Sequence, residues 1–233
     1  MLEILAFDAD DTLWHNEPHF NQTHDKFRNL LADYQDPEWV ERRLIETEIR
    51  NLKHFGYGVK GFTLSMIETA VELTEGRITG DEIEQIIAFG KAMLNAPLRL
   101  IDDVPEVLNT LGKHYDLMII TKGDLFDQET KIARSGLAEH FKYIEIVSEK
   151  HPEQYRSILQ RHQIQPKSFL MTGNSLKSDV LPTLSIGGHA VHVPYHTTWI
   201  HEKVAPELLT RHTFHTVSKL CELPALLEKL QQS

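Results

Sequence analysis

The chain has 233 residues, of which 41% are hydrophobic and 25% are charged, and its net charge at pH 7 is −10. This length and composition are typical of a globular protein with one large domain or a core that carries an inserted subdomain. The acidic balance argues against nucleic acid or an anionic membrane as the main partner, because no basic field attracts phosphate backbones.

The apolar runs, the cysteine count and the histidine spacing argue against a secreted, membrane-spanning, disulfide-bonded or zinc-binding protein. Met1-Leu2-Glu3 is acidic and the apolar run behind it is too short for a secretion signal, and no stretch approaches the roughly 18 apolar residues of a membrane span. We therefore expect a cytoplasmic protein. A single cysteine, Cys221, excludes an internal disulfide, and we expect it to pack in a helical stretch. The 14 histidines lack ligand spacing, so no zinc site is expected.

The first predicted element is a buried strand over residues 2–7, and it leads directly into the acidic residues Asp8, Asp10 and Asp11. Carboxylates near a core repel one another and lose hydration, so this cluster is costly unless a cation or a reaction needs it. Side chains two apart on a strand point the same way, so Asp8 and Asp10 can face one pocket. Acidic residues also end strands and begin turns, and the pair alone leaves both interpretations open.

Residues 16–96 carry the pattern of helices and no convincing strand. Asp36-Pro37 is a helix-start signal, and Val40 and Leu44 follow it at helical spacing. Thr79 with Glu82 resembles a capping box ahead of a second apolar face. We predict an all-helical domain inserted between the first strand and the rest of the chain.

The remaining sequence alternates short apolar runs with helical patterns. Strands are predicted over residues 116–120, 143–147, 169–171 and 189–193, and helices over 104–114, 125–135, 152–162 and 178–185. Short all-apolar strands between helices are typical of a parallel sheet covered on both faces. With the first strand, they predict a doubly wound, Rossmann-like α/β core of five strands, formed by residues 1–15 and 97–233.

Chemically reactive side chains follow the predicted strands. In open parallel sheets, ligands bind beyond the carboxyl ends of the strands. We therefore expect one site at this edge, which combines Asp8, Asp10, Thr121, Lys150, Asn174 and Asp179.

Four segments in this order resemble the motifs of the haloacid dehalogenase-like (HAD) superfamily of hydrolases. Residues 7–14, Phe-Asp-Ala-Asp-Asp-Thr-Leu-Trp, are similar to motif I. Thr121 and Lys150 stand where motifs II and III have a hydroxyl residue and a lysine. Residues 171–180, Met-Thr-Gly-Asn-Ser-Leu-Lys-Ser-Asp-Val, resemble the Gly-Asp-Ser-x-x-x-Asp loop of motif IV, with Asn174 in place of its first acid.

The resemblance implies a role for each matching residue. Asp8 is the expected nucleophile, which forms an aspartyl-phosphate, and Asp10 is the expected acid and base, which protonates the leaving group and then activates water. Phosphate oxygens would be bound by the hydroxyl of Thr121, the backbone N–H of Lys122 and the ammonium of Lys150.

The resemblance also implies a Mg²⁺ cofactor. The expected ligands are Asp8, the backbone carbonyl of Asp10, Asn174 and Asp179, because Mg²⁺ prefers oxygen ligands. An amide oxygen can coordinate Mg²⁺, but Asn174 supplies one negative charge fewer than the usual acid. Which of Asn174 and Asp179 binds the metal directly therefore stays open.

Asp10 favours phosphate chemistry within the superfamily, because dehalogenases lack this second acid and a halide leaving group needs no proton. The insert at residues 16–96 has the position of the cap that, in such enzymes, closes over the site and admits small substrates. We therefore expect a Mg²⁺-dependent phosphatase of a small phosphorylated metabolite. The alternatives are a phosphomutase or phosphonatase with the same machinery, and a binding or regulatory protein with weak turnover.

Overall fold

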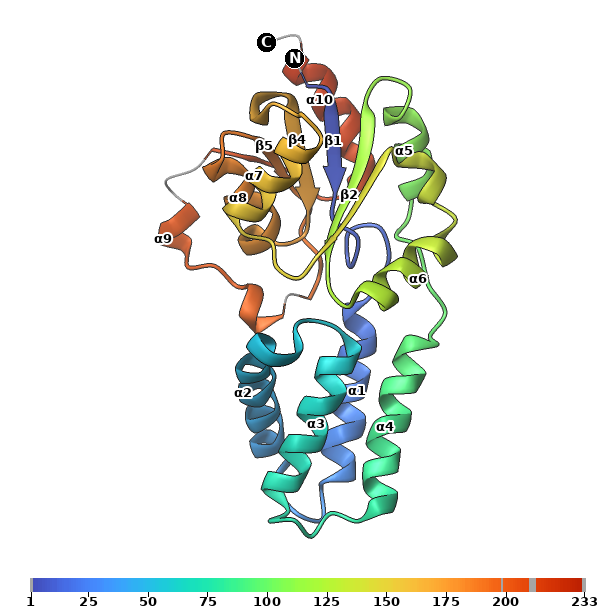
Figure 1. Cartoon of the computed structure of the whole chain (residues 1–233), viewed down its shortest axis with the longest axis vertical. Helices are drawn as coiled ribbons and strands as arrows, with labels where there is room; N and C mark the ends of the chain where they lie inside the picture. Colours follow the sequence, from blue (N-terminus) through green and yellow to red (C-terminus); the bar gives the residue numbers. More distant parts are fainter. Residues whose placement is uncertain (1, 198, 210–212, 232–233) are drawn as a thin grey trace. The chain divides into compact units, whose positions relative to one another are not determined.

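One parallel sheet organises the core in the computed structural model, which describes residues 2–197, 199–209 and 213–231 (Figure 1). Within these residues the strand order is β3-β2-β1-β4-β5-β6. The strands are β1 (Ile4–Phe7), β2 (Asp116–Lys122), β3 (Tyr143–Val147), β4 (Phe169–Gly173), β5 (His189–His192) and β6 (His215–Thr216). The predicted doubly wound α/β fold class is confirmed.

Helices cover both faces of this sheet (Figure 1). The helices of this part of the chain are α5 (Val104–Leu111), α6 (Leu125–Ser135), α7 (Pro152–Arg161), α8 (Leu181–Ser185), α9 (Pro206–Leu209) and α10 (Leu223–Gln231), of which α9 lies away from the faces of the sheet. Short helical turns lie at Ala138–His140, Pro166–Ser168, Leu176–Val180, Ile200–Glu202 and Leu220–Glu222.

The alternation of side chains along β1 explains how one strand serves two hydrophobic layers. Leu5 and Phe7 pack on the face that α5 and α10 cover, whereas Ile4 and Ala6 pack on the face that α7 covers. Because every residue of β1 is buried, the strand reads in the sequence as a continuous apolar run.

Three local predictions differ from the structure. The two-residue strand β6 was not predicted, because two residues show no periodicity. The predicted helix over 178–185 is divided into a wide turn at Leu176–Val180 and the helix α8, which has a proline in its first turn. Cys221 is exposed in the short turn Leu220–Glu222, so our expectation that it packs in a helix was wrong.

The chain divides into two compact units by its internal contacts. The first unit contains residues 1–15 and 98–233, and the second contains residues 16–97. Within the first unit, the two connecting segments pair with each other: His15 N donates to Arg99 O at 2.9 Å, and Ile101 N donates to Leu13 O at 3.0 Å. This pairing fixes the points at which the chain leaves and re-enters the first unit.

The second unit is built from α1 (Glu17–Leu30), α2 (Pro37–Phe55), α3 (Val59–Leu73) and α4 (Gly80–Leu94). Its helix starts follow the sequence signals. The Asp36 side chain accepts hydrogen bonds from the backbone N–H groups of Glu38 and Trp39. Thr79 and Glu82 form a complete capping box at the start of α4. These side chains bond backbone donors that have no partner within the helix.

The helical unit has an apolar core and also buries several polar side chains, among them one carboxyl group. Phe27, Leu44 and Met66 are fully buried there. Glu48 is also buried, and its Oε1 lies 3.4 Å from Nε2 of His24. Burial raises the pKa of Glu48 to about 7, although His24 acts in the opposite direction. Ionised Glu48 is therefore costly within this core.

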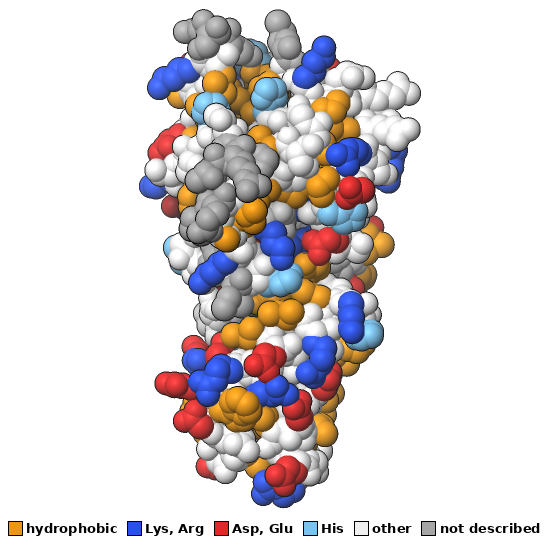
Figure 2. Space-filling model, turned by 90° about the vertical axis from the view of Figure 1, so that its left-hand side faces the viewer, with side chains coloured by type: hydrophobic (Ala, Val, Ile, Leu, Met, Phe, Trp, Pro, Cys, Tyr) orange, Lys and Arg blue, Asp and Glu red, His pale blue; other side chains and the backbone are white. Residues whose placement is uncertain are grey.

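The exterior of the helical unit carries charges of both signs. Arg43 of α2 pairs with Glu46 at 2.5 Å and also with Glu72 of α3, and Arg50 pairs with Glu68 at 2.8 Å. On the face drawn in Figure 2, basic and acidic side chains likewise lie side by side over this unit. Among the described helices, none has the length and apolar character that crossing a membrane requires.

Candidate active site

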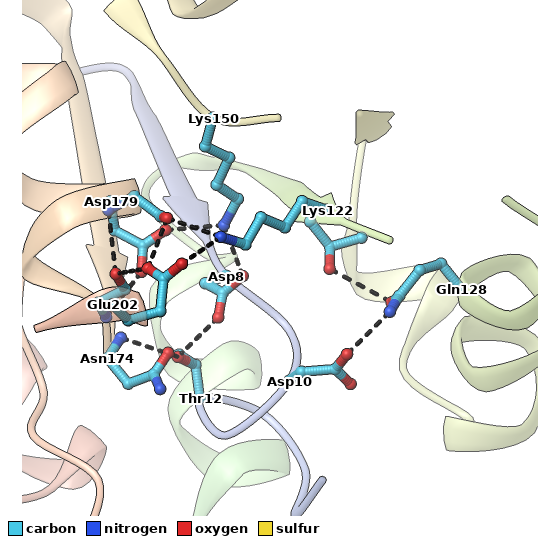
Figure 3. Close-up of polar contacts among 12 residues, drawn as sticks. Asp8, Asp10, Thr12, Lys122, Gln128, Lys150, Asn174, Asp179 and Glu202 are labelled. Atoms are coloured by element: carbon cyan, nitrogen blue, oxygen red, sulfur yellow. Dashed lines mark hydrogen bonds and ion pairs between the residues drawn. The ribbon is translucent and has the colours of Figure 1, made fainter. Parts of the chain in front are cut away.

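The functional candidates lie at the carboxyl edge of the sheet, where β1, β2 and β4 end next to one another (Figure 3). The strand order reverses between β1 and β4, because the chain adds β2 and β3 on one side and β5 and β6 on the other. This is the position at which open α/β sheets form a binding crevice.

Lys150 joins two of the predicted site residues. Its Nζ lies 2.5 Å from Asp8 Oδ1 and 2.7 Å from Asp179 Oδ1, and its side chain is 1% exposed. Burial alone would lower the pKa of Lys150, but Asp179 and Asp8 raise it above its usual value. Lys150 is therefore a buried ammonium between two carboxyl groups, which is stable only while both are present.

Asp8 follows β1 directly and is held by both backbone and side-chain contacts. Its backbone N–H donates to Thr172 O of β4 at 2.9 Å, which continues the β1–β4 pairing by one residue. Burial raises the pKa of the Asp8 carboxyl to about 7; Lys150 lowers it and Asp179 adds to the rise. The ionised form of Asp8 thus depends on nearby positive charge.

Thr12 connects Asp8 with Asn174. Its hydroxyl lies 3.3 Å from Asp8 Oδ2 and 3.3 Å from Asn174 Oδ1, and it accepts a hydrogen bond from Asn174 N at 3.1 Å. Thr12 belongs to motif I, but no role was predicted for it. The contact brings one carboxylate oxygen and one amide oxygen to the same hydroxyl group.

Asp179 is oriented by the loop that carries it. Its Oδ2 accepts from the backbone N–H of Ser175 at 3.0 Å, while its Oδ1 faces Lys150. A Cβ at position 173 would lie 2.2 Å from Asp179 Oδ2, so Gly173 is required by this close approach. Both oxygens of Asp179 therefore accept from donors of the protein itself.

Asp10 points away from Asp8 towards α6 (Figure 3). Its Oδ1 accepts from Trp14 Nε1 at 2.6 Å and its Oδ2 accepts from Gln128 Nε2 at 2.8 Å. Lys131 Nζ lies 3.1 and 3.2 Å from the two oxygens. The Thr121 hydroxyl donates to Gln128 Oε1 at 3.2 Å. Gln128 therefore links the two predicted residues Asp10 and Thr121.

Gln128 and Lys131 were not among the predicted site residues. They lie three residues apart on α6, the helix that follows the strand of motif II. Residues with this spacing share a helix face, so a polar pair on the first turns after motif II is the signal that could have identified them.

The Lys122 ammonium binds an acidic residue that the sequence analysis also missed. Lys122 Nζ lies 2.5 Å from Glu202 Oε1 and 2.9 Å from Ser178 Oγ. Glu202 also accepts from the hydroxyls of Ser175 and Ser178. Burial would raise the pKa of Glu202, but Lys122 and these hydroxyls lower it to about 2. Glu202 follows β5 in a stretch without periodicity, so no sequence pattern identified it.

The side chains near Asp8 fit a hard cation by their chemistry. Asp8 and Asn174 supply oxygen atoms, which Mg²⁺ prefers, and Thr12 holds the two side chains together. Over the residues that the structure describes, no group of three His, Cys, Asp or Glu side chains forms a metal site. A cation bound near Asp8 would therefore need the amide oxygen of Asn174 as one of its ligands.

Comparisons with known proteins agree with the motifs. Residues 2–184 match the family model of the haloacid dehalogenase-like hydrolases. A solved haloacid dehalogenase-like family hydrolase from Xanthomonas campestris is 40% identical with a TM-score of 0.88, over 98% of this chain and 91% of that chain. The putative HAD-hydrolase YfnB from Bacillus subtilis, described as bound to magnesium, has the same fold at 19% identity and a TM-score of 0.67, over 97% of this chain and 98% of that chain.

A curated relative carries a phosphatase name. The glyceraldehyde 3-phosphate phosphatase of Pyrococcus furiosus is 26% identical over 147 residues, which are 59% of this chain and 58% of that protein. The chain therefore aligns with somewhat more than half of the length of this relative. From its matching family model and its similarity to the Xanthomonas protein, the chain belongs to the haloacid dehalogenase-like hydrolases.

Proposed function

We propose that this hydrolase is a Mg²⁺-dependent phosphatase that cleaves a small phosphorylated metabolite through an aspartyl-phosphate. The observation that carries the proposal is the different setting of two carboxyl groups in one loop. Asp8 is buried against Lys150, whereas Asp10 is turned towards α6 and is linked through Gln128 to Thr121. Two carboxyl groups in unlike surroundings suit a nucleophile and a separate acid and base.

The proposed reaction has two steps. In the first, an oxygen of Asp8 attacks the phosphorus atom, the bond to the leaving oxygen breaks, and Asp10 gives its proton to that oxygen. In the second, Asp10 takes a proton from water as the water oxygen attacks the phosphorus atom, which frees phosphate and regenerates Asp8. In-line displacement requires the acid to stand apart from the nucleophile, and the orientation of Asp10 away from Asp8 (Figure 3) supports this assignment.

The positive charge for phosphate binding comes from Lys150 in this proposal. Its ammonium offsets the repulsion between Asp8 and a phosphate dianion, and the hydroxyl of Thr121 donates to a phosphate oxygen. The backbone N–H of Lys122 is the further proposed donor, while the side chain of Lys122 pairs with Glu202.

The proposed Mg²⁺ ligands are the Asp8 carboxylate, the Asn174 amide oxygen and the backbone carbonyl of Asp10. When bound, the ion supplies positive charge that reduces the repulsion between the Asp8 carboxylate and the anionic substrate. Asp179 is not a ligand in this proposal. Its oxygens face Lys150 and the Ser175 N–H, and it orients Lys150.

The phosphatase name of the Pyrococcus furiosus relative supports a small phosphorylated substrate. The acidic net charge and the mixed charges of the helical unit fit such a substrate better than nucleic acid. We propose that residues 16–97 form the cap that selects the substrate, as the resemblance to the superfamily implies.

The test is phosphate release from a panel of small phosphate esters, with and without Mg²⁺, by the wild type and by Asp8→Asn. Asparagine keeps the shape of the side chain but removes its nucleophilic carboxylate. Release that needs Mg²⁺ and disappears in the variant is expected. Full activity in Asp8→Asn would contradict the nucleophile assignment, and phosphorylated products in place of free phosphate would favour a phosphomutase.

One observation favours a second candidate, a binding or regulatory protein with weak turnover. Asn174 supplies no charge to the oxygen set at Asp8, and weaker metal binding lowers the turnover expected of this chemistry. A magnesium titration in the presence of a phosphate mimic separates the candidates. Binding of both without phosphate release from any ester would support the second.

A further inference from the structure

We propose that Gln128 and Lys131 are positioning residues, which hold Asp10 for proton transfer and couple its orientation to phosphate binding at Thr121. This inference rests on the proposed function. Neither residue belongs to the four motifs, and both lie on α6.

The hydrogen bonds at Asp10 define its orientation almost completely. One oxygen accepts from Trp14 and the other accepts from Gln128, and Lys131 lies within 3.2 Å of both. Lys131 in turn lies 3.2 Å from Asp127, one helical turn earlier. The side chain of Lys131 is 16% exposed, so its ammonium is held between two carboxyl groups in little water. Such contacts restrict the rotation of the Asp10 side chain.

Gln128 also responds to phosphate binding at Thr121, because it accepts the hydrogen bond of the Thr121 hydroxyl. The Thr121 hydroxyl has one proton, which it donates to Gln128 Oε1 at 3.2 Å. A phosphate oxygen bound at Thr121 competes with Gln128 for this proton. Because the Nε2 of the same planar amide group donates to Asp10, a change at Thr121 is passed to Asp10 through one amide group.

Gly123, which has no side chain, allows the Gln128 amide to lie close to the backbone after Thr121. The residue has a φ of +146°, and a Cβ there would lie 3.0 Å from Gln128 Nε2 and 3.3 Å from Gln128 Cγ. A side chain at position 123 would therefore crowd the amide that bonds Asp10. This contact ties the loop after Thr121 to the placement of Gln128.

The experiment compares two aryl esters of similar shape, p-nitrophenyl phosphate and phenyl phosphate. Phenol is the poorer leaving group, so its departure needs the proton from Asp10 more. In Gln128→Met and Lys131→Met, kcat/KM for phenyl phosphate is expected to fall on the order of 10²-fold, the lower end of what a positioned proton donor contributes. The kcat/KM for p-nitrophenyl phosphate is expected to change little, because p-nitrophenolate leaves without a proton.

A second signature concerns the intermediate. Both esters form the same aspartyl-phosphate, whose hydrolysis needs Asp10 as a base. The variants should therefore release p-nitrophenol in a rapid burst stoichiometric with the enzyme, followed by slow turnover. A residue with a merely structural role would lower kcat/KM for both esters by the same factor and would produce no burst.

Three further variants complete the design. Lys142→Met removes an exposed lysine that pairs with Asp116 and serves as the matched control, with unchanged kinetics expected. Lys131→Arg keeps the charge and should retain most activity. Gln128→Glu keeps the acceptor for Thr121 but loses the donor to Asp10, so it should behave like Gln128→Met, which also keeps the inference testable if Lys131→Met does not fold.

The outcomes separate the inference from the proposed function. If the wild type releases phosphate and the Gln128 and Lys131 variants lose activity equally on both esters, or lose none, the inference is wrong and the proposed function stands. If the wild type hydrolyses neither ester nor any member of the wider panel, the proposed function fails and the inference fails with it.

Discussion

A buried lysine is the residue on which the candidate site depends most. Lys150 pairs with both Asp8 and Asp179, so its ammonium offsets part of the cost of burying the two acidic groups. A lysine is most often a solvated surface residue, and nothing in the immediate sequence around Lys150 indicates burial. Only its place after the third strand distinguished it, and only the folded structure shows how deeply it is buried.

Replacing Lys150 with alanine should remove about 2–4 kcal/mol of transition-state stabilisation, the usual contribution of one electrostatic group, and kcat/KM should fall accordingly. The reason is that Asp8 and an anionic phosphate would meet without the ammonium between them. Steady-state kinetics on the best ester of the panel measure the effect, with the exposed Lys167→Ala as the control. An unchanged kcat/KM in Lys150→Ala would remove the lysine from the reaction.

Asn174→Asp should preserve or tighten Mg²⁺ binding, because it adds a negative charge to the oxygens near Asp8. Calorimetric titration with Mg²⁺ measures the affinity, and Asn109→Asp on the exposed side of α5 controls for the change in net charge. Clearly weaker binding in Asn174→Asp would show that this side chain does not contact the metal.

At the scale of elements, α6 has a more specific role than its sequence indicates. Its boundaries, Leu125–Ser135, agree with the predicted helix, and Asp124 caps it by accepting from Asp127 N at 3.0 Å. Periodicity predicted where the helix lies but not what its polar face contacts. That face holds Asp10, which is more than a hundred residues away in the chain.

The capping box of α4 offers a test of local stability. Thr79→Ala removes the hydroxyl that accepts from Glu82 N, and it should lower the free energy of unfolding by about 1 kcal/mol. Urea unfolding followed by circular dichroism measures the change. Thr110→Ala is the control, since its hydroxyl bonds only a carbonyl within α5. Equal effects of the two substitutions would show that the cap adds no particular stability.

At the scale of the whole molecule, Glu48 should make stability depend on pH. Burial raises the pKa of Glu48 from its ordinary value of 4.5 to about 7 in the folded chain, so the folded state binds more protons between these values and stability falls as pH rises through them. The loss reaches about 3 kcal/mol above pH 7 on this difference. Burial opposes the charged form of His24, but its contacts with Glu41 and Glu48 raise its pKa, so His24 also binds more protons in the folded chain and adds to the fall in stability as pH rises through its own titration range.

Glu48→Gln should therefore raise the free energy of unfolding at pH 8 and change it little at pH 4.5. Urea unfolding at the two pH values measures the difference, and the exposed Glu84→Gln of α4 is the matched control. A stability gain in Glu48→Gln that is equal at both pH values would contradict the assignment of the effect to ionisation.

The sequence alone determined the fold class, most strands and helices of the core, the helical insert and the order of the four motifs. These properties depend on local periodicity and on neighbouring residues, as in the apolar run of β1 and the capping box at Thr79. The tertiary structure decided which side chains meet. Thr12 reaches Asn174, Gln128 reaches Asp10 and Glu202 reaches Lys122 across distant segments, because the sheet order brings strand ends together and no local pattern records such contacts.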